Sequence, residues 1–269
     1  MALAIGIALG SGPLSHESLL PSSAEPAPPR EKADTGATAD DVATVVAPAV
    51  YGARLEGRTV ALLASPGVDQ DTLDALQVGI EASDGSVTAR WTAGEGLVGA
   101  GEKVLVDTLG SQLLEQLDGH GADPDVAAYE RMGQLIGTAI ATRDPVSATP
   151  GPDALTIRQS IDAASLLSHD AGEPKRASLV LLVLGDDLDD NIVEGLVSGL
   201  AARAAGVVVA APGRDSNLSV LEDLGTVTTV DGVTGATGQL AAVLALARAE
   251  GEPGGSYGAS GADGVLPLG

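Results

Sequence analysis

The densest group of chemically active side chains is the acidic run from Asp186 to Asn191. Carboxylate oxygens of this kind bind hard cations. However, a calcium loop that starts at the second aspartate needs Gly at its sixth and Glu at its twelfth position, where Ile192 and Ser198 stand. An acidic run before a helical pattern is also typical of a helix N-terminus. We therefore expect Asp189 or Asp190 to cap a helix, and we expect no metal site here.

A glycine-rich segment from Gly94 to Gly101 suggests a phosphate-binding loop. The P-loop requires Gly-Lys-Ser/Thr directly after a strand, but here Glu102 separates the glycines from Lys103, and Val104 follows. The turn after the first predicted strand is Ser-Pro-Gly-Val-Asp, which lacks the glycine spacing of dinucleotide-binding turns. We interpret the segment as an ordinary flexible loop and expect no cofactor.

Nucleophiles and soft metal ligands are scarce. The sequence has no Cys, and its only histidines are His16, His120 and His169. Ser65 lacks the G-x-S-x-G pattern of a nucleophilic serine. Met132 lies in a helical apolar pattern, where filling the core is its expected role. These residues predict neither an enzyme nor a metal centre.

The charge of the chain restricts its partners. Fourteen basic residues against 37 acidic ones give a formal net charge of -23. Such a surface repels phosphate backbones over most of its area, which excludes nucleic acid as a partner. Phe is absent and the aromatic content is 1%, so the core must be aliphatic.

The composition predicts four segments along the chain. Residues 1–14 are apolar and uncharged but too short to span a bilayer, so we interpret them as the end of a truncated membrane anchor. Residues 15–41 are rich in Pro, Ala and Ser and predict a disordered linker. Residues 42–250 form the expected folded domain, and residues 251–269 a Gly-rich C-terminal tail. Deleting residues 1–40 is therefore expected to leave thermal stability almost unchanged.

Short apolar runs alternate with longer amphipathic segments. The runs that predict strands are 59–64, 86–91, 179–184, 206–211 and 226–230. The segments that predict helices are one after Asp69 or Asp71, then 103–117, 125–142, 155–167, 192–204, 218–224 and 239–248. This alternation predicts an α/β fold with a Rossmann-like, mostly parallel sheet and helices on both faces.

The order strand, turn, helix, strand occurs twice. Aligning the two copies places Asp71 on Asp190 and, after one inserted residue, Gly79 on Gly199. We interpret the copies as two weakly similar β-α-β halves. Ligands in such folds bind beyond the carboxyl ends of the strands, where the strand order reverses. The ligand-rim candidates are Ser65, Pro66, Gly67, Asp186, Asp187, Pro212, Gly213 and Asp231.

Several segments together resemble one known family. They are ALAIGIALGSGPL at the N-terminus, SPG after the first strand, GQLIGTAI at 133–140, the pair LVLLVL and GVVVAA, then TVDGVTGATGQLAAVLAL and SYGASGADGVLPL. In their order and in the two ends, they resemble the actinobacterial copper transport outer-membrane protein (MctB-like) family over essentially the whole chain.

The resemblance implies a non-enzymatic cell-envelope protein that acts in copper efflux or resistance and forms a pore in the outer membrane. Members of this family normally begin with a membrane-length helix, often followed by a coiled coil; this sequence begins inside that helix and has a Pro-rich linker in place of the coiled coil. A homo-oligomer is expected for any pore. The alternative is an inner-membrane-anchored α/β domain that binds a protein partner or small ligand without copper chemistry.

Overall fold

The computed structural model of the chain describes residues 35–144, 148–170, 172, 174–213 and 216–268. The expected anchor and most of the expected linker, residues 1–34, lie outside the described residues. Residues 36–269 belong to one unit. Within the described residues, none of the helices combines the length and the apolar character that crossing a bilayer requires.

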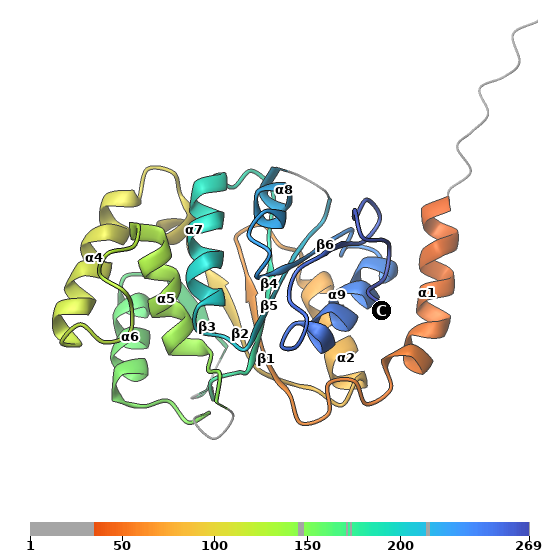
Figure 1. Ribbon diagram of the computed structural model, residues 1–269, viewed down its shortest axis with the longest axis horizontal. Helices are drawn as coiled ribbons and strands as arrows, with labels where there is room; N and C mark the ends of the chain where they lie inside the picture. The colour runs from red at the N-terminus through yellow and green to blue at the C-terminus, as the bar shows by residue number, and fades with distance from the viewer. Residues whose placement is uncertain (1–34, 145–147, 171, 173, 214–215, 269) are drawn as a thin grey trace, which may run out of the picture. The chain divides into compact units, whose positions relative to one another are not determined.

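A seven-stranded sheet in the order β3-β2-β1-β4-β5-β6-β7 organises this unit (Figure 1). Six strands run parallel to their neighbours: β1 (Thr59–Ala64), β2 (Ser86–Ala93), β4 (Leu179–Val183), β5 (Gly206–Ala211), β6 (Thr228–Asp231) and β7 (Ser256–Tyr257). At one edge, β3 (Leu167–His169) pairs antiparallel with β2. The predicted α/β fold and mostly parallel sheet are thus confirmed.

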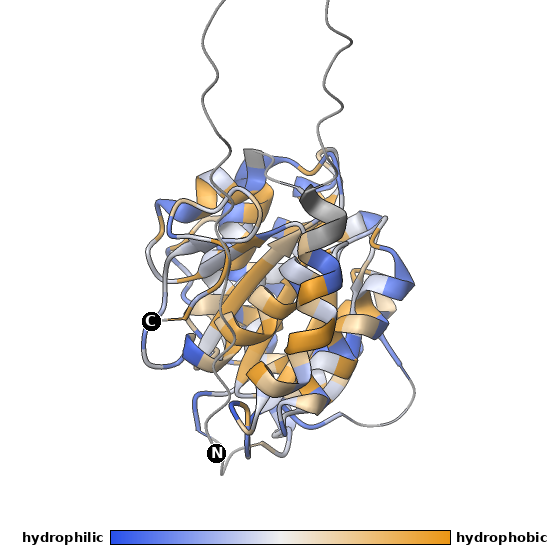
Figure 2. Ribbon diagram, turned by 90° about the vertical axis from the view of Figure 1, so that its right-hand side faces the viewer, coloured by the Kyte–Doolittle hydropathy of each residue, from blue (hydrophilic) through white to orange (hydrophobic). Residues whose placement is uncertain are grey.

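Helices cover both faces of the sheet (Figure 1). One face packs against α1 (Thr35–Tyr51), α2 (Gln70–Ala82) and α9 (Ala236–Arg248). The other packs against α3 (Glu95–Val98), α4 (Lys103–Gln116), α5 (Ala128–Ile140), α6 (Pro152–Ala163), α7 (Asp190–Ala201) and α8 (Ser216–Glu222). The central strands are apolar on both faces because both are covered, as Figure 2 shows by its orange strands behind the helices.

Helices α5 and α7 pack closely through glycine. A Cβ atom added to Gly133 would lie 2.3 Å from the Leu196 carbonyl oxygen, and one added to Gly199 would lie 2.2 Å from the Glu130 carbonyl oxygen. At one end of the contact Gly195 lies against Tyr129, and at the other Gly137 lies against Arg203. The partners thus advance together, from Tyr129 to Gly137 on α5 and from Gly195 to Arg203 on and after α7, so the two helices run parallel.

Helix α1 begins inside the segment expected to be linker. Its Asp40 carboxylate accepts a hydrogen bond from the Thr237 backbone N–H at 2.9 Å. The N-cap of α9 is Gly235, which has no side chain to do this, so Asp40 supplies the capping group from another helix. The expected linker therefore includes part of a helix that contacts α9, and the small effect expected from deleting residues 1–40 stays a prediction.

Part of the expected Gly-rich tail is held against the sheet. Ser256 and Tyr257 form β7 beside β6, and the buried Asp231 carboxylate accepts from the Ser260 backbone N–H at 2.9 Å. A Cβ at Gly258 would lie 2.1 Å from an Asp231 carboxylate oxygen, and its φ is +112°. Glycine is required there because the chain passes so close to this carboxylate.

Candidate functional site

The strand order reverses between β1 and β4, so their following loops diverge to opposite sides. Sheets of this kind have a crevice at that point, beyond the carboxyl ends of the strands. Here the crevice is a surface cleft of about 520 Å³, which we call the acidic cleft. It is lined by Pro66, Gly67, Glu95, Val98, Gly99, Ala100, Asp186, Asp187, Leu188 and Asp189.

Four of the predicted rim residues line this cleft together. Pro66 and Gly67 come from the loop after β1, whereas Asp186 and Asp187 come from the loop after β4. Both aspartates are exposed, and Asp187 has a φ of +60°, a left-handed conformation that Asp tolerates better than most residues. The cleft thus has the composition that the sequence predicted for its two central loops.

Carboxylates dominate the charge of the acidic cleft. Glu95 at the start of α3 and Asp189 before α7 join Asp186 and Asp187, and none of the described Lys or Arg residues lines the cleft. Asp189 accepts hydrogen bonds from the backbone N–H groups of Asn191 at 3.0 Å and Ile192 at 3.3 Å. The predicted cap of this helix is therefore confirmed. Among the described residues, no group of three or more His, Asp or Glu is arranged to hold a metal ion.

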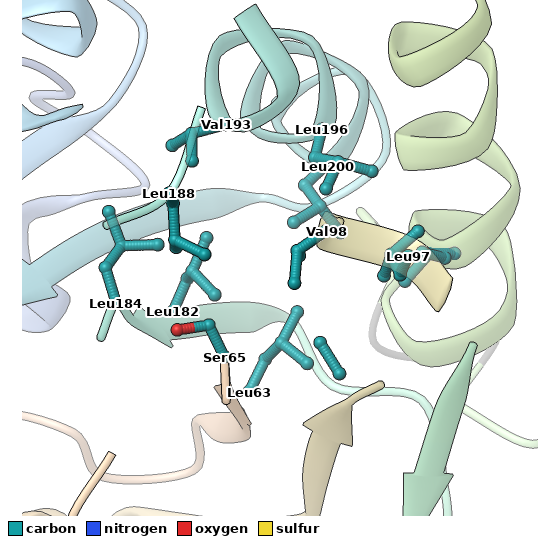
Figure 3. A pocket seen from close by; sticks show the side chains of 12 residues that line it. Leu63, Ser65, Leu97, Val98, Leu182, Leu184, Leu188, Val193, Leu196 and Leu200 are labelled. Atoms are coloured by element: carbon teal, nitrogen blue, oxygen red, sulfur yellow. The ribbon is translucent and has the colours of Figure 1, made fainter. Parts of the chain in front are cut away.

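A small apolar cavity lies beneath the acidic cleft and shares Val98 and Leu188 with it. Its volume is about 30 Å³. Figure 3 shows aliphatic side chains converging on it, with the Ser65 hydroxyl as the one oxygen among the labelled side chains. That hydroxyl accepts from the Gly185 N–H at 2.6 Å. Because the cavity is small and apolar, ligands larger than a water molecule must stay in the cleft above.

Tyr129 lies near the acidic end of α5 and α7. Its side chain is 8% exposed, and its buried hydroxyl has no hydrogen-bond partner within the described structure. Burial raises the pKa of this phenol, and the negative charges of Asp189 and Glu102 raise it further. Asp189 thus acts on a neutral group inside the domain as well as on the cleft that it lines.

The remaining rim candidates lie elsewhere. Pro212 and Gly213 follow β5 and do not line the acidic cleft. Asp231 is the last residue of β6 and is 3% exposed, and its carboxylate accepts hydrogen bonds from the backbone of the C-terminal segment. The structure therefore gives Asp231 a structural contact, and it keeps Pro212 and Gly213 out of the cleft.

Sequence reasoning missed the third wall of the cleft. Glu95 and Val98 belong to α3, within the glycine-rich segment interpreted as a flexible loop, and that interpretation is wrong for these residues. Leu97 and Val98 are buried against the core, which orders the segment. The available signal was that β2 ends at the same edge as β1 and β4, so its following residues belong to the same rim.

The soft metal ligands are dispersed within the described residues. Met132 is fully buried on α5, and His120 is an exposed residue after α4. His169 lies on the edge strand β3, with its ring centroid 4.6 Å from that of Trp91. These side chains occupy three different environments, none of them in the acidic cleft.

The described domain thus has an α/β fold with a crevice lined by carboxylates at the point where its strand order reverses. The chain belongs to the copper transport outer membrane protein family, MctB, whose family model matches residues 1–267. The resemblance drawn from the sequence is thereby confirmed, and the family's function is copper transport in the outer membrane. No curated protein matches the chain.

Proposed function

We propose that the described domain serves copper transport as a non-enzymatic part of the cell envelope, and that it binds a positively charged group of a partner protein in the acidic cleft. The observation that carries this proposal is the convergence of Glu95, Asp186, Asp187 and Asp189 around one cleft of about 520 Å³. Clustered like charges in a concave surface raise the local concentration of ligands of opposite charge.

The size and lining of the cleft favour a side chain over a bare ion. Val98 and Leu188 provide apolar contacts at its floor, next to the carboxylates. A Lys or Arg side chain combines an apolar stem with a charged head and matches both surfaces. A partner protein that presents such a side chain is therefore the proposed ligand.

The arrangement of polar groups supports a binding role without catalysis. Ser65 is the hydroxyl residue closest to this crevice, yet its oxygen is occupied by the Gly185 N–H. Nucleophilic catalysis by serine requires an adjacent base, and neither His120 nor His169 lines the cleft or the cavity below it. The membership of the chain in a transport family agrees with this role.

Copper handling is proposed to arise from assembly and not from ligation by this chain. Tight binding of Cu(I) needs two or three soft ligands within bonding distance. Met132 is buried in the core, and His120 and His169 lie on separate elements, which supports this view. We propose that the chain forms homo-oligomers in the envelope and that the N-terminal segment attaches it to a membrane.

The two β-α-β units that meet at the cleft, β1–α2–β2 and β4–α7–β5, are proposed to be related halves of a Rossmann-like fold. In support, each helix is capped by an Asp directly after the turn, Asp69 for α2 and Asp189 for α7. The halves adjoin through the β1–β4 pair, which places the cleft between them.

The test of the proposed function is the binding of a lysine-containing peptide to the full chain by isothermal titration calorimetry. The variant Glu95→Gln/Asp186→Asn/Asp187→Asn removes three charges from the cleft and should weaken binding by about tenfold or more at low salt. The matched control, Asp41→Asn/Glu56→Gln/Glu115→Gln, removes three exposed charges outside the cleft. Equal weakening in both variants would show that only net charge matters and would refute the cleft as the site.

A further inference from the structure

A second cleft lies near the amino ends of β4 and β5, whereas the acidic cleft lies beyond the carboxyl ends of the strands. The charged side chains that line this second cleft are positive. It has a volume of about 390 Å³ and is lined by Arg143, Arg176 and Arg203. Arg143 follows α5, Arg176 precedes β4, and Arg203 follows α7. We call it the arginine cleft. In a chain with only 14 basic residues and a net charge of -23, three guanidinium groups around one cleft require an explanation.

The hydrogen bonds of two of these arginines account for only part of their donors. Arg143 donates from Nε to the Ala204 carbonyl at 3.1 Å and from Nη2 to the Ala201 carbonyl at 2.9 Å, which fixes its position at the end of α7. Arg203 donates from Nη2 to Gln134 Oε1 at 3.3 Å. Its Nε is buried and has no hydrogen-bond partner within the described structure. Buried donors are nearly always paired, so this Nε leaves part of the guanidinium charge of Arg203 without a local acceptor.

Two of the cleft arginines repel each other. Burial lowers the pKa of Arg203, and repulsion by the positive charge of Arg143 lowers it further, whereas Asp123 acts in the opposite direction. Asp144 and Arg176 each have a further interaction. The hydroxyls of Thr138 and Thr142 donate to the carbonyls of Gly121 and Asp144. A bound anion in the cleft would relieve the repulsion between Arg143 and Arg203.

We propose that the arginine cleft binds a phosphate group. A carboxylate is planar and is held by one guanidinium through two parallel hydrogen bonds. Three guanidiniums that approach from the ends of three different elements suit a tetrahedral phosphoryl anion with several acceptor oxygens. The shared chemistry is the phosphoryl oxyanion, either as a free soluble phosphate or as a phospholipid headgroup. This inference is independent of the proposed function, because the two clefts share no residue.

The first experiment measures binding of inorganic phosphate to the full chain by calorimetry, in chloride buffer of matched ionic strength. Wild-type protein should bind saturably, and Arg203→Gln and Arg176→Gln should each weaken binding by about tenfold or more. The matched control is Arg54→Gln, because exposed Arg54 also donates from Nε to a helix carbonyl, that of Val50, outside the cleft. Arg54→Gln should leave phosphate affinity unchanged. If Arg203→Gln does not fold, the phosphate affinity of Arg176→Gln relative to that of Arg54→Gln tests the proposal.

Two results would overturn the proposal. One is the absence of saturable phosphate binding by the wild-type chain, which would leave the arginines as helix C-terminal caps only. The other is equal phosphate affinity in wild type, Arg203→Gln and Arg176→Gln. Co-sedimentation with phosphatidylglycerol vesicles and with phosphatidylcholine vesicles distinguishes the two sources. Binding to the former that Arg203→Gln abolishes identifies an anionic headgroup, and phosphate binding without co-sedimentation identifies a soluble phosphate.

Discussion

The acidic cleft and the arginine cleft lie at opposite ends of helix α7. Before its N-terminus, Asp189 lines one cleft; beyond its C-terminus, Arg203 lines the other, together with Arg143 after α5. A helix macrodipole favours negative charge at its N-terminus and positive charge at its C-terminus. The sign of charge in each cleft thus follows from the direction in which the parallel sheet orients its helices.

The charged side chains of the two clefts differ in the hydrogen bonds that they make within the protein. Asp189 completes two hydrogen bonds to its own helix, so part of the acidic cleft has a purely structural role. Arg143 donates two hydrogen bonds to carbonyls at the end of a different helix, α7. The dipole therefore explains the sign of the charge at each end, whereas the gathering of three arginines around one cleft points to an anionic ligand.

The largest expected effect comes from separating the helices that position both clefts. Gly199→Ala places a Cβ against the Glu130 carbonyl oxygen and should destabilise the protein by about 3 kcal/mol, measured by urea unfolding. The control is Gly110→Ala on α4, where the nearest atom is the Arg131 side chain at 3.4 Å, and where helix propensity favours Ala by about 0.5–1 kcal/mol. Similar stabilities for the two variants would contradict the tight α5–α7 contact.

A smaller effect is expected from the cap at the acidic end. Asp189→Ala removes the acceptor for two backbone N–H groups of α7 and should lower the free energy of unfolding by about 1 kcal/mol. Asp186→Ala removes a neighbouring exposed charge that does not cap α7 and should change it by less than about 0.5 kcal/mol. Equal losses, measured by thermal unfolding, would mean that charge and not capping gives Asp189 its effect.

The carboxylates near Tyr129 should also affect how stability depends on pH. The folded protein holds the Tyr129 proton more tightly than the unfolded chain, since burial and then Asp189 and Glu102 raise its pKa. This contribution to stability is present below about pH 10, the ordinary tyrosine pKa, and is lost as the pH rises through the folded value. Tyr129→Phe should therefore reduce the loss of unfolding free energy at alkaline pH. Part of that loss should persist because burial also raises the pKa of Tyr51.

The Asp189→Asn variant separates the two causes. It removes a nearby negative charge and should lower the pKa of Tyr129 relative to wild type, as followed by tyrosinate absorbance. An unchanged titration curve would exclude Asp189 as a cause and leave burial and Glu102.

The smallest effect is expected at the strained turn of the acidic cleft. Asp187 adopts a φ of +60°, which glycine accommodates without cost. Asp187→Gly should leave stability unchanged or raise it by up to about 1 kcal/mol. In the peptide titration, Asp187→Gly should weaken binding as much as Asp187→Asn does. A marked loss of stability in Asp187→Gly would show that the carboxylate makes a structural contact.

The sequence predicts the layout of the acidic cleft better than that of the arginine cleft. Strands such as β4 and β5 are apolar on both faces, so their ends, and hence Asp186 and Asp187, can be located from the hydrophobic pattern. The short edge strands β3 and β7 have two or three residues, too few for a periodic signal. Their existence depends on tertiary pairing with β2 and β6.

The arginine cleft has no sequence signature because its members are far apart in the chain. Arg143, Arg176 and Arg203 meet only because α5 and α7 run parallel and both end beside the start of β4 and β5. Likewise, Asp231 follows a predicted strand, yet its carboxylate is occupied by Ser260. That contact depends on where the C-terminal segment folds, which no local pattern specifies.

The most direct test of the account concerns copper, because the family transports copper while the described ligands are dispersed. The measurement is a titration of the full chain with Cu(I) in the presence of a competing chelator. The account predicts no submicromolar site, with any copper-dependent behaviour arising in the assembled protein or with partners. A stoichiometric site that disappears when His120, Met132 or His169 is replaced would contradict it and assign copper ligation to this chain.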